Sequence, residues 1–368
     1  LELIKDCAEW TIAGRKKTMV LENGKKPLHY GLLPKWAYGG DIHQLGYPLF
    51  PNFACWRGLH DTAWLMEQIG ENDLAVRYRR EADDYHKTLL AVIDTIYRKD
   101  AKPPYLPLRA DATESDHGDF YQLFAGLLLD LLPFEFAAPQ SSYMRDYIED
   151  DNRTFCQLPR FRRVEGGLDA LYGIGLTLDR LRQNRIREFL LGFYAFQVFN
   201  MEQTCFTSRE QNLVYSSDLH LRTPLPVADW SDPLPCSSAV GLLYLRHLLV
   251  TEETRGAGNY SGKLLLLYGA PRRWYAAGNR IDVENAVTHV GKVSFAVAVS
   301  RDLRRIRAEI RFPGDSRCSA IKIRLRHPQG KPMQSVTIDG KIAETFDARD
   351  ELVEIPLPDG EHHVEARY

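Results

Sequence analysis

The spacing of apolar residues changes near Gly256, and this change constrains the fold of the 368-residue chain more than any other feature. Before that point apolar residues recur every three or four positions, which is typical of amphipathic helices. After it they alternate at every second position, as Val293 and Phe295 do, which is typical of half-buried strands. The sequence therefore predicts a helical domain over residues 1–256 and a β domain over residues 257–368.

Two consecutive segments illustrate the helical part. One apolar stripe begins at Phe53 and ends before Gly70, a residue type that commonly follows the last turn of a helix. A second stripe with the same period runs over residues 74–96, so the two segments predict an antiparallel helical hairpin. Similar patterns recur, giving about eight helices joined alternately by tight turns and long loops. This alternation is typical of a ring of helical hairpins whose long loops line one mouth.

The strand-like runs continue to the end of the chain. An Asp339-Gly340 pair between two of them predicts a two-residue hairpin turn. Because the runs are short, alternating and separated by turn residues, we expect an antiparallel β-sandwich. Its polar face carries scattered Arg, Lys and Glu, so we interpret it as a supporting domain without the active site.

Composition and spacing argue against several classes of protein. The formal net charge of -2 offers nothing to attract nucleic acid. The six cysteines contain no CxxC pair, which favours free thiols, and we expect neither a metal nor a cofactor. No apolar run approaches the roughly 20 residues of a membrane span. We therefore expect a soluble protein, cytoplasmic or periplasmic, and the oligomeric state stays open.

The stretch GLLPKWAYGGD, residues 31–41, places Trp36 and Tyr38 ahead of two glycines and the carboxylate of Asp41. The residues that follow bring further aromatic, amide and charged side chains, namely His43, Asn52, Trp56, Arg57 and Asp61. Sugars are bound by such sets, because pyranose faces stack on aromatic rings while hydroxyls bond to acids, amides and cations. These residues therefore predict a carbohydrate-binding site.

Three of these residues have an alternative interpretation. Trp56 lies on the apolar stripe of its predicted helix, so it is equally compatible with the protein core. Arg57 and Asp61 are four positions apart, which is the spacing of an ion pair on a helix surface.

Two further loops carry candidate residues. The first precedes a predicted helix and contributes Asp119, Tyr121 and Gln122, although Asp119 is also a suitable N-terminal cap. The second, over residues 201–236, is long for a connection without secondary structure, which favours a functional role. Within it Glu210 lies beside Arg209 in a polar segment, where a carboxylate can be held and its proton affinity tuned.

The chain resembles the six-hairpin glycosidase superfamily. The resemblance is carried by the hairpin pattern and by the stretches GLLPKWAYGGD and NFACWRGLHDTAWL. Members of the superfamily include trehalases, α-L-rhamnosidases and processing α-glucosidases. The resemblance covers the helical part and implies an (α/α)6 toroid, to which β-sandwiches are often attached. A complete toroid needs more helices than the roughly eight in this sequence. We therefore expect the remaining hairpins upstream of Leu1.

The resemblance also implies hydrolysis of a glycosidic bond by two carboxylates, which stand about 6.5 to 9.5 Å apart in inverting enzymes. We pair Asp41 with Glu210 as the two catalytic carboxylates, with the roles of acid and base unassigned between them, because loops from different hairpins can supply this separation. The predicted substrate contacts are Trp36, Tyr38, His43, Trp56, Arg57, Asp61, Asp119, Tyr121, Gln122 and Arg209.

Two alternatives to hydrolysis stay open. A polysaccharide lyase would use Tyr38 or His43 as a base and Asn52 or Arg57 to neutralise a uronate. A sugar-binding protein without catalytic activity is the other alternative, and it is favoured if the upstream hairpins do not exist.

Overall fold

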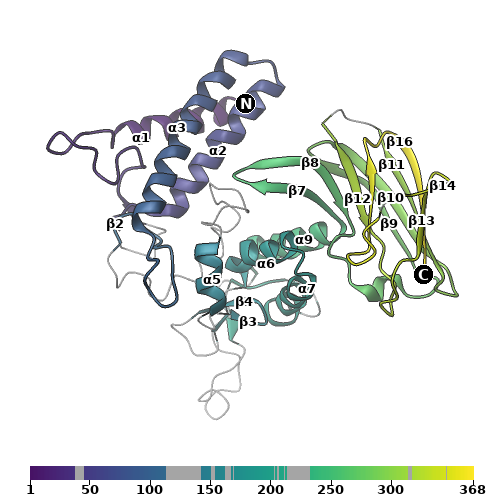
Figure 1. Cartoon of the computed structure of the whole chain (residues 1–368). Coiled ribbons are helices and arrows are strands. Elements are labelled where there is room, and N and C mark those ends of the chain that lie inside the picture. Colours follow the sequence, from purple (N-terminus) through teal and green to yellow (C-terminus); the bar gives the residue numbers. More distant parts are fainter. Residues whose placement is uncertain are drawn as a thin grey trace, which may run out of the picture. The chain divides into compact units, whose positions relative to one another are not determined.

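Helices and antiparallel sheets both occur along the chain, as the sequence predicts (Figure 1). The structure is a computed structural model, and it describes residues 1–37, 45–112, 142–150, 154–161, 167–168, 170–202, 204, 207–210, 212–213, 233–313, 317–344 and 346–368.

The chain forms two compact units that are interleaved in sequence. The first consists of Leu1–Asp179, Tyr194–Ser238 and Arg255–Asn259. The second consists of Arg180–Phe193, Ala239–Thr254 and Tyr260–Tyr368. A single boundary between folding domains near Gly256 stays a prediction.

Three long helices open the first unit: α1 (Glu2–Lys16), α2 (Leu49–Gln68) and α3 (Asn72–Ile96). Helices α2 and α3 form the predicted hairpin, and Gly70 adopts the left-handed φ of 81° that ends α2. Buried side chains of all three helices pack together in one cluster, which includes Ile12, Leu59 and Tyr78.

A buried arginine joins the first and third of these helices. The Arg15 side chain is 0% exposed, and its guanidinium lies 4.2 Å from the centre of the Tyr85 ring. It donates hydrogen bonds to the Gly31 carbonyl at 2.9 Å, the Glu81 carbonyl at 3.2 Å and Asp84 Oδ2 at 2.8 Å. These bonds attach the loop after α1 and the body of α3 to one side chain.

The rest of the first unit is built from short elements. A small antiparallel sheet has the order β3 (Thr154–Phe155), β4 (Leu158–Phe161), β5 (Gly167–Leu168) and β6 (Asn212–Leu213). The same unit contains α5 (Ser142–Asp150), the 3₁₀ turn η2 (Leu171–Gly173), the first residues of α6 (Ile174–Arg182) and the π-helical turn η3 (Phe196–Asn200). Helices α7 (Ile186–Ala195) and α9 (Pro235–Leu249) belong mainly to the second unit.

The second unit contains two sheets that share one hydrophobic core. The six-stranded sheet has the order β14 (Lys341–Ile342), β13 (Ser335–Ile338), β16 (Gly360–Arg367), β11 (Arg305–Phe312), β10 (Gly291–Val299) and β9 (Arg280–Thr288). The four-stranded sheet has the order β15 (Leu352–Pro356), β12 (Ala320–Arg324), β8 (Asn259–Leu266) and β7 (Val250–Gly256). A short 3₁₀ turn, η4, covers Arg272–Tyr275.

Two details of the second unit differ from the sequence predictions. The change from helix to strand was expected near Gly256, but α9 ends at Leu249 and β-branched Val250 begins strand β7. Strand β12 pairs in parallel with β8, although a purely antiparallel arrangement was expected. The Asp339-Gly340 turn is confirmed, with left-handed φ values of 51° and 78° between β13 and β14.

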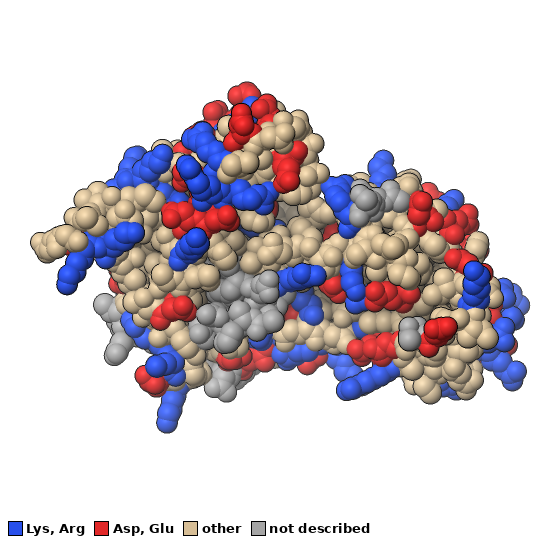
Figure 2. Space-filling model, turned by 45° about the horizontal axis from the view of Figure 1, so that its top comes forward, with Lys and Arg blue, Asp and Glu red and all other residues tan. Residues whose placement is uncertain are grey.

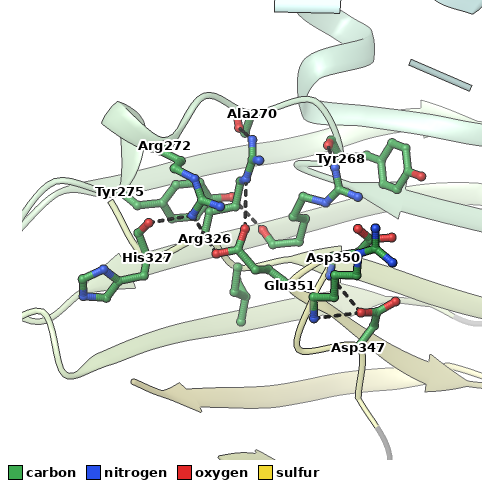
Figure 3. A network of polar contacts seen from close by, with 12 residues as sticks. Tyr268, Ala270, Arg272, Tyr275, Arg326, His327, Asp347, Asp350 and Glu351 are labelled. Atoms are coloured by element: carbon green, nitrogen blue, oxygen red, sulfur yellow. Dashed lines mark hydrogen bonds and ion pairs between the residues drawn. The ribbon is translucent and has the colours of Figure 1, made fainter. Parts of the chain in front are cut away.

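Arginines also join elements of the second unit (Figure 3). Glu351 is 4% exposed and accepts hydrogen bonds from Arg272 Nη1 at 2.7 Å and Arg326 Nε at 3.3 Å. Nearby, Arg324 lies 4.2 Å from the centre of the Tyr268 ring, and its Nη1 donates to the Tyr268 carbonyl at 2.8 Å.

The turn between α6 and α7 is anchored in the same region. Asn184 adopts a left-handed φ of 59°, and its Oδ1 accepts a hydrogen bond from Arg324 Nη2 at 2.6 Å. Its Nδ2 donates to Asp350 Oδ2 at 2.8 Å. One amide side chain thereby joins a helical turn to strand β12 and to the segment before β15.

Basic and acidic side chains are intermixed over the face seen in Figure 2. Several form ion pairs, such as Arg77 with Glu9 at 2.6 Å and Arg79 with Glu67 at 2.9 Å. Among the described residues, no helix combines the length and the apolar character that crossing a membrane requires.

Candidate functional site

Glu210 is held by a hydrogen bond from a tyrosine. The Tyr172 hydroxyl donates to Glu210 Oε1 at 2.7 Å. Strands β5 and β6 explain this contact, because Leu168 pairs with Asn212 in an antiparallel register. Because the two strands are antiparallel, the residues after Leu168 and the residues before Asn212 leave the strand pair at the same end. Tyr172 and Glu210 therefore meet beyond that end.

The segment that carries Glu210 is fixed by buried polar side chains. Asn200, at the end of the π-helical turn, donates from Nδ2 to the Arg209 carbonyl at 3.0 Å and to Ser237 Oγ at 2.7 Å. The Arg209 amide donates in turn to the Asn200 carbonyl at 3.2 Å. Ser208 lies within hydrogen-bond distance of Ser238, with 2.8 Å between the two hydroxyl oxygens. Such supporting bonds restrict the positions that the neighbouring carboxylate can take.

The predicted Trp36 loop begins and ends in a short hairpin. Strand β1 (Trp36–Ala37) pairs with β2 (Leu45–Gly46), and Trp36 lies directly opposite Gly46. Trp36 is 70% exposed, an uncommon state for so large an apolar ring. An exposed indole on a strand presents a flat surface of the kind on which sugar rings stack.

The base of this hairpin is attached to the segment before residue 113. The Tyr47 amide donates to Asp111 Oδ1 at 3.0 Å, and the Ala110 amide donates to the Tyr47 carbonyl at 2.9 Å. The Tyr47 ring stacks on His29 with 4.4 Å between ring centres. Burial raises the pKa of the Tyr47 hydroxyl, and the charges of Asp111 and Glu22 raise it further.

Arg57 and Asp61 form the ion pair that their spacing allows. Arg57 Nε lies 2.8 Å from Asp61 Oδ2, and His60 Nδ1 lies 3.0 Å from Asp61 Oδ1. Burial alone would raise the pKa of Asp61, but the hydrogen bond from His60 and the charge and hydrogen bond of Arg57 outweigh it and lower the pKa. Gly258 of the β7–β8 turn lies against this cluster, because a Cβ there would come within 3.1 Å of Arg57 Nε. A role for Arg57 and Asp61 in binding substrate stays a prediction.

The structure corrects the prediction for Trp56. This residue is 2% exposed, belongs to the core of the first unit, and stacks on His86 with 5.1 Å between ring centres. A ring enclosed in this way has no face for a sugar, so we assign Trp56 to the core.

Asn52, which the lyase alternative used, is also structural. Its side chain is 0% exposed. Its Oδ1 accepts hydrogen bonds from the Leu33 amide at 2.9 Å and the Tyr85 hydroxyl at 2.6 Å, while Nδ2 donates to the Pro48 carbonyl at 2.6 Å. An amide occupied in this way cannot neutralise a uronate.

Several predicted site residues lie outside the described part of the chain. These are Tyr38, Asp41, His43, Asp119, Tyr121 and Gln122. Their roles, and the pairing of Asp41 with Glu210, stay predictions.

Three residues of the site region were not predicted from the sequence. Tyr172, Asn200 and Asp111 each act through a partner more than 30 positions away in the chain. Neither apolar period nor local motif signals such contacts. Only the position of Asn200, at the end of a strongly helical pattern and before a long loop, was a sign that could have been used.

Comparisons with known proteins return structural neighbours only. No protein-family model matches the sequence, and no curated protein matches it. The chain is similar to the structure of an α-L-rhamnosidase from Dictyoglumus thermophilum, with a TM-score of 0.45 and 10% identity over 100% of this chain and 37% of that chain. It is also similar to a structure described as a glycoside hydrolase, with a TM-score of 0.40 and 10% identity over 98% of this chain and 68% of that chain. The chain thus spans little more than a third of the length of the first neighbour.

Proposed function

We propose that the protein is a glycoside hydrolase that acts on an oligosaccharide or polysaccharide with two carboxylates, and that Glu210 is one of them. The observation that carries this proposal is the 2.7 Å hydrogen bond from the Tyr172 hydroxyl to Glu210 Oε1, on a segment fixed by Asn200 and Ser208. Acid or base catalysis requires a carboxylate held at a defined position. Glu210 meets this requirement.

Glu210 and Asp41 together supply the acid and the base of the proposed mechanism, and the two roles are not assigned between them. One carboxyl group protonates the leaving oxygen, the other takes a proton from the attacking water, and the pair acts with inversion.

The proposed architecture follows the sequence predictions. The helices of residues 1–256 belong to a complete or partial α/α toroid, and residues 257–368 form a β-sandwich that supports it. Helix α2 brings Arg57 and Asp61 to the substrate, and the segments outside the helices bring Trp36 and Arg209. The carbohydrate is the only partner that the proposal requires.

The lyase alternative is less well supported. It needs an amide or a cation to neutralise a uronate, but Asn52 is buried and bonded to three groups, and Arg57 is paired with Asp61. A sugar-binding protein without catalytic activity is separated from a hydrolase by the experiment below.

The test is the release of reducing sugar from a panel of aryl glycosides and oligosaccharides by the parent protein and two variants. Glu210→Gln keeps the shape of the side chain and removes its proton chemistry, so we expect kcat/KM to fall by about 10²- to 10⁴-fold. Tyr172→Phe removes the hydroxyl that donates to Glu210. It should lower kcat by roughly tenfold and leave KM almost unchanged, because one hydrogen bond to a charged group contributes about 1.5 kcal/mol.

A matched control is Tyr194→Phe, which removes a tyrosine hydroxyl elsewhere in the first unit. Its turnover should stay within twofold of the parent. Normal turnover in Glu210→Gln would remove this residue from the mechanism. Sugar binding without any cleavage by the parent protein would replace the hydrolase with a binding protein.

A further inference from the structure

The register of the β1–β2 hairpin places Trp36 and two charged residues on one face. In an antiparallel pair, side chains of directly opposed residues lie on the same face, about 5 Å apart at Cβ. Trp36 lies opposite Gly46. The Trp36 side chain is therefore on the same face of the hairpin as a Cβ atom built on Gly46 would be. Leu45, 67% exposed, is opposed to Ala37 and lies on the other face.

Glycine at position 46 leaves room for Arg109 and Asp111. A Cβ built on Gly46 would lie 2.8 Å from Asp111 Oδ1 and 3.0 Å from Arg109 Nε, closer than real Cβ atoms approach such groups. Arg109 and Asp111 therefore pack directly against the backbone opposite Trp36. The register thereby assigns a carboxylate and a guanidinium to the same face of the hairpin as Trp36.

The carboxylate is held in place by the backbone. Asp111 Oδ1 accepts the Tyr47 amide at 3.0 Å, and Arg109 Nε lies 3.6 Å from the same oxygen. The Asp111 side chain is 32% exposed and the Arg109 side chain 19% exposed, so both are oriented by the protein and still reach the surface. Tyr47 directly follows Gly46, the last residue of strand β2, which couples the position of Asp111 to the hairpin.

We propose that Trp36, Arg109 and Asp111 form a sugar subsite in which a pyranose stacks on the indole and bonds through its hydroxyls to the carboxylate and the guanidinium. The subsite deepens the proposed function, on which its biological role rests. Asp111 repels an anionic sugar and accepts hydrogen bonds from hydroxyls, and its charge offsets that of Arg109. The substrate class is therefore a neutral glycan and not a uronate.

The test begins with an array of neutral and uronate oligosaccharides probed with the parent protein. The neutral oligosaccharide that binds best is then titrated calorimetrically against variants. Trp36→Ala removes the stacking surface, and Asp111→Asn removes the charge but keeps an acceptor for the Tyr47 amide. Each should weaken binding about tenfold, the effect of losing one charged hydrogen bond or one stacked ring. Gly46→Ala should weaken it severalfold, because the new methyl group displaces both charged side chains.

Leu45→Ala is the matched control, since it shortens an exposed apolar side chain on the opposite face of the same hairpin. Its affinity should stay within twofold of the parent, and all four variants should keep the parent melting temperature within a few degrees. Preferred binding of uronates, absence of glycan binding, or parent-like affinity in Trp36→Ala and Asp111→Asn would each overturn the subsite.

The subsite and the hydrolase can fail separately. If glycosides are cleaved while Trp36→Ala and Asp111→Asn keep the parent KM and affinity, the subsite is wrong and the hydrolase stands. If those variants lose affinity and the parent cleaves none of the glycosides, the subsite stands and the hydrolase is wrong.

Discussion

Each compact unit buries an arginine over a tyrosine ring, but the two arginines are neutralised differently. The guanidinium lies 4.2 Å from the ring centre in both cases, Arg15 over Tyr85 and Arg324 over Tyr268. Arg15 also reaches a carboxylate, Asp84, at 2.8 Å. Arg324 donates instead to a carbonyl and an amide oxygen, and its buried Nε has no partner among the described residues.

The difference shows that a buried guanidinium stacked on a tyrosine can either stabilise a fold or cost it free energy. A cation taken out of water is compensated when a carboxylate and several oxygens surround it, and is only partly compensated by neutral oxygens. Burial accordingly lowers the pKa of Arg324. We infer that Arg15 stabilises the first unit, whereas Arg324 contributes to the geometry of the second unit more than to its stability.

The largest expected effect is that of Arg15→Met, an apolar replacement of similar length. It leaves the Gly31 and Glu81 carbonyls without this donor, so we expect a loss of about 3 kcal/mol in the free energy of unfolding. Urea denaturation followed by circular dichroism measures it. Arg77→Met is the matched control, because Arg77 forms an exposed ion pair with Glu9 and such pairs contribute at most about 1 kcal/mol. Equal losses in the two variants would contradict the role of Arg15.

Arg324→Met should have a smaller effect than Arg15→Met. The variant loses bonds to Asn184 and to the Tyr268 carbonyl, but it also removes a buried cation, so we expect a net loss of about 1 kcal/mol or less. The measurement is the same urea denaturation. A loss larger than that of Arg15→Met would reverse the comparison between the units.

The smallest effect concerns a surface turn of the second unit. Burial would raise the pKa of Asp339, but hydrogen bonds from the His363 amide and the His362 ring outweigh it and lower the pKa. Its contribution to stability is therefore present above the ordinary value of 3.8 and is lost as the pH falls through the lower folded value. Asp339→Asn keeps a residue that tolerates the left-handed turn, so its melting temperature should converge with that of the parent as the pH falls from about 5 to about 3. A constant difference across this range would exclude Asp339 as the titrating group.

Local features of the fold were predictable, and contacts between distant segments were not. The hairpin of α2 and α3 and the Asp339-Gly340 turn follow from apolar period and turn chemistry, which act over a few neighbouring residues. The burial of Arg15 depends on oxygens 16 to 69 positions away, which no local pattern encodes. The position of Arg15 in a helical sequence pattern therefore did not reveal that its side chain would be buried.

The candidate site divides in the same way. The exposed position of Trp36 agrees with the sequence prediction of an aromatic side chain presented ahead of two glycines. For Trp56 the sequence left surface and core as alternatives, and packing against segments distant in sequence, such as His86 of α3, encloses its ring. The contact of Tyr172 with Glu210 depends on a strand pair two residues long, which is too short for any periodicity.

The interleaved second unit has a consequence for the order in which the chain can fold during its synthesis. Residues 180–193 belong to the second unit, but they leave the ribosome long before most of it. Asn184, for example, bonds to Arg324 and Asp350, which are synthesised 140 and 166 positions later. At about 5–20 residues per second the helical turn waits on the order of ten seconds for these partners. During that interval its apolar residues Phe189 and Leu181, which pack near Gly269 in the finished protein, are open to chaperones.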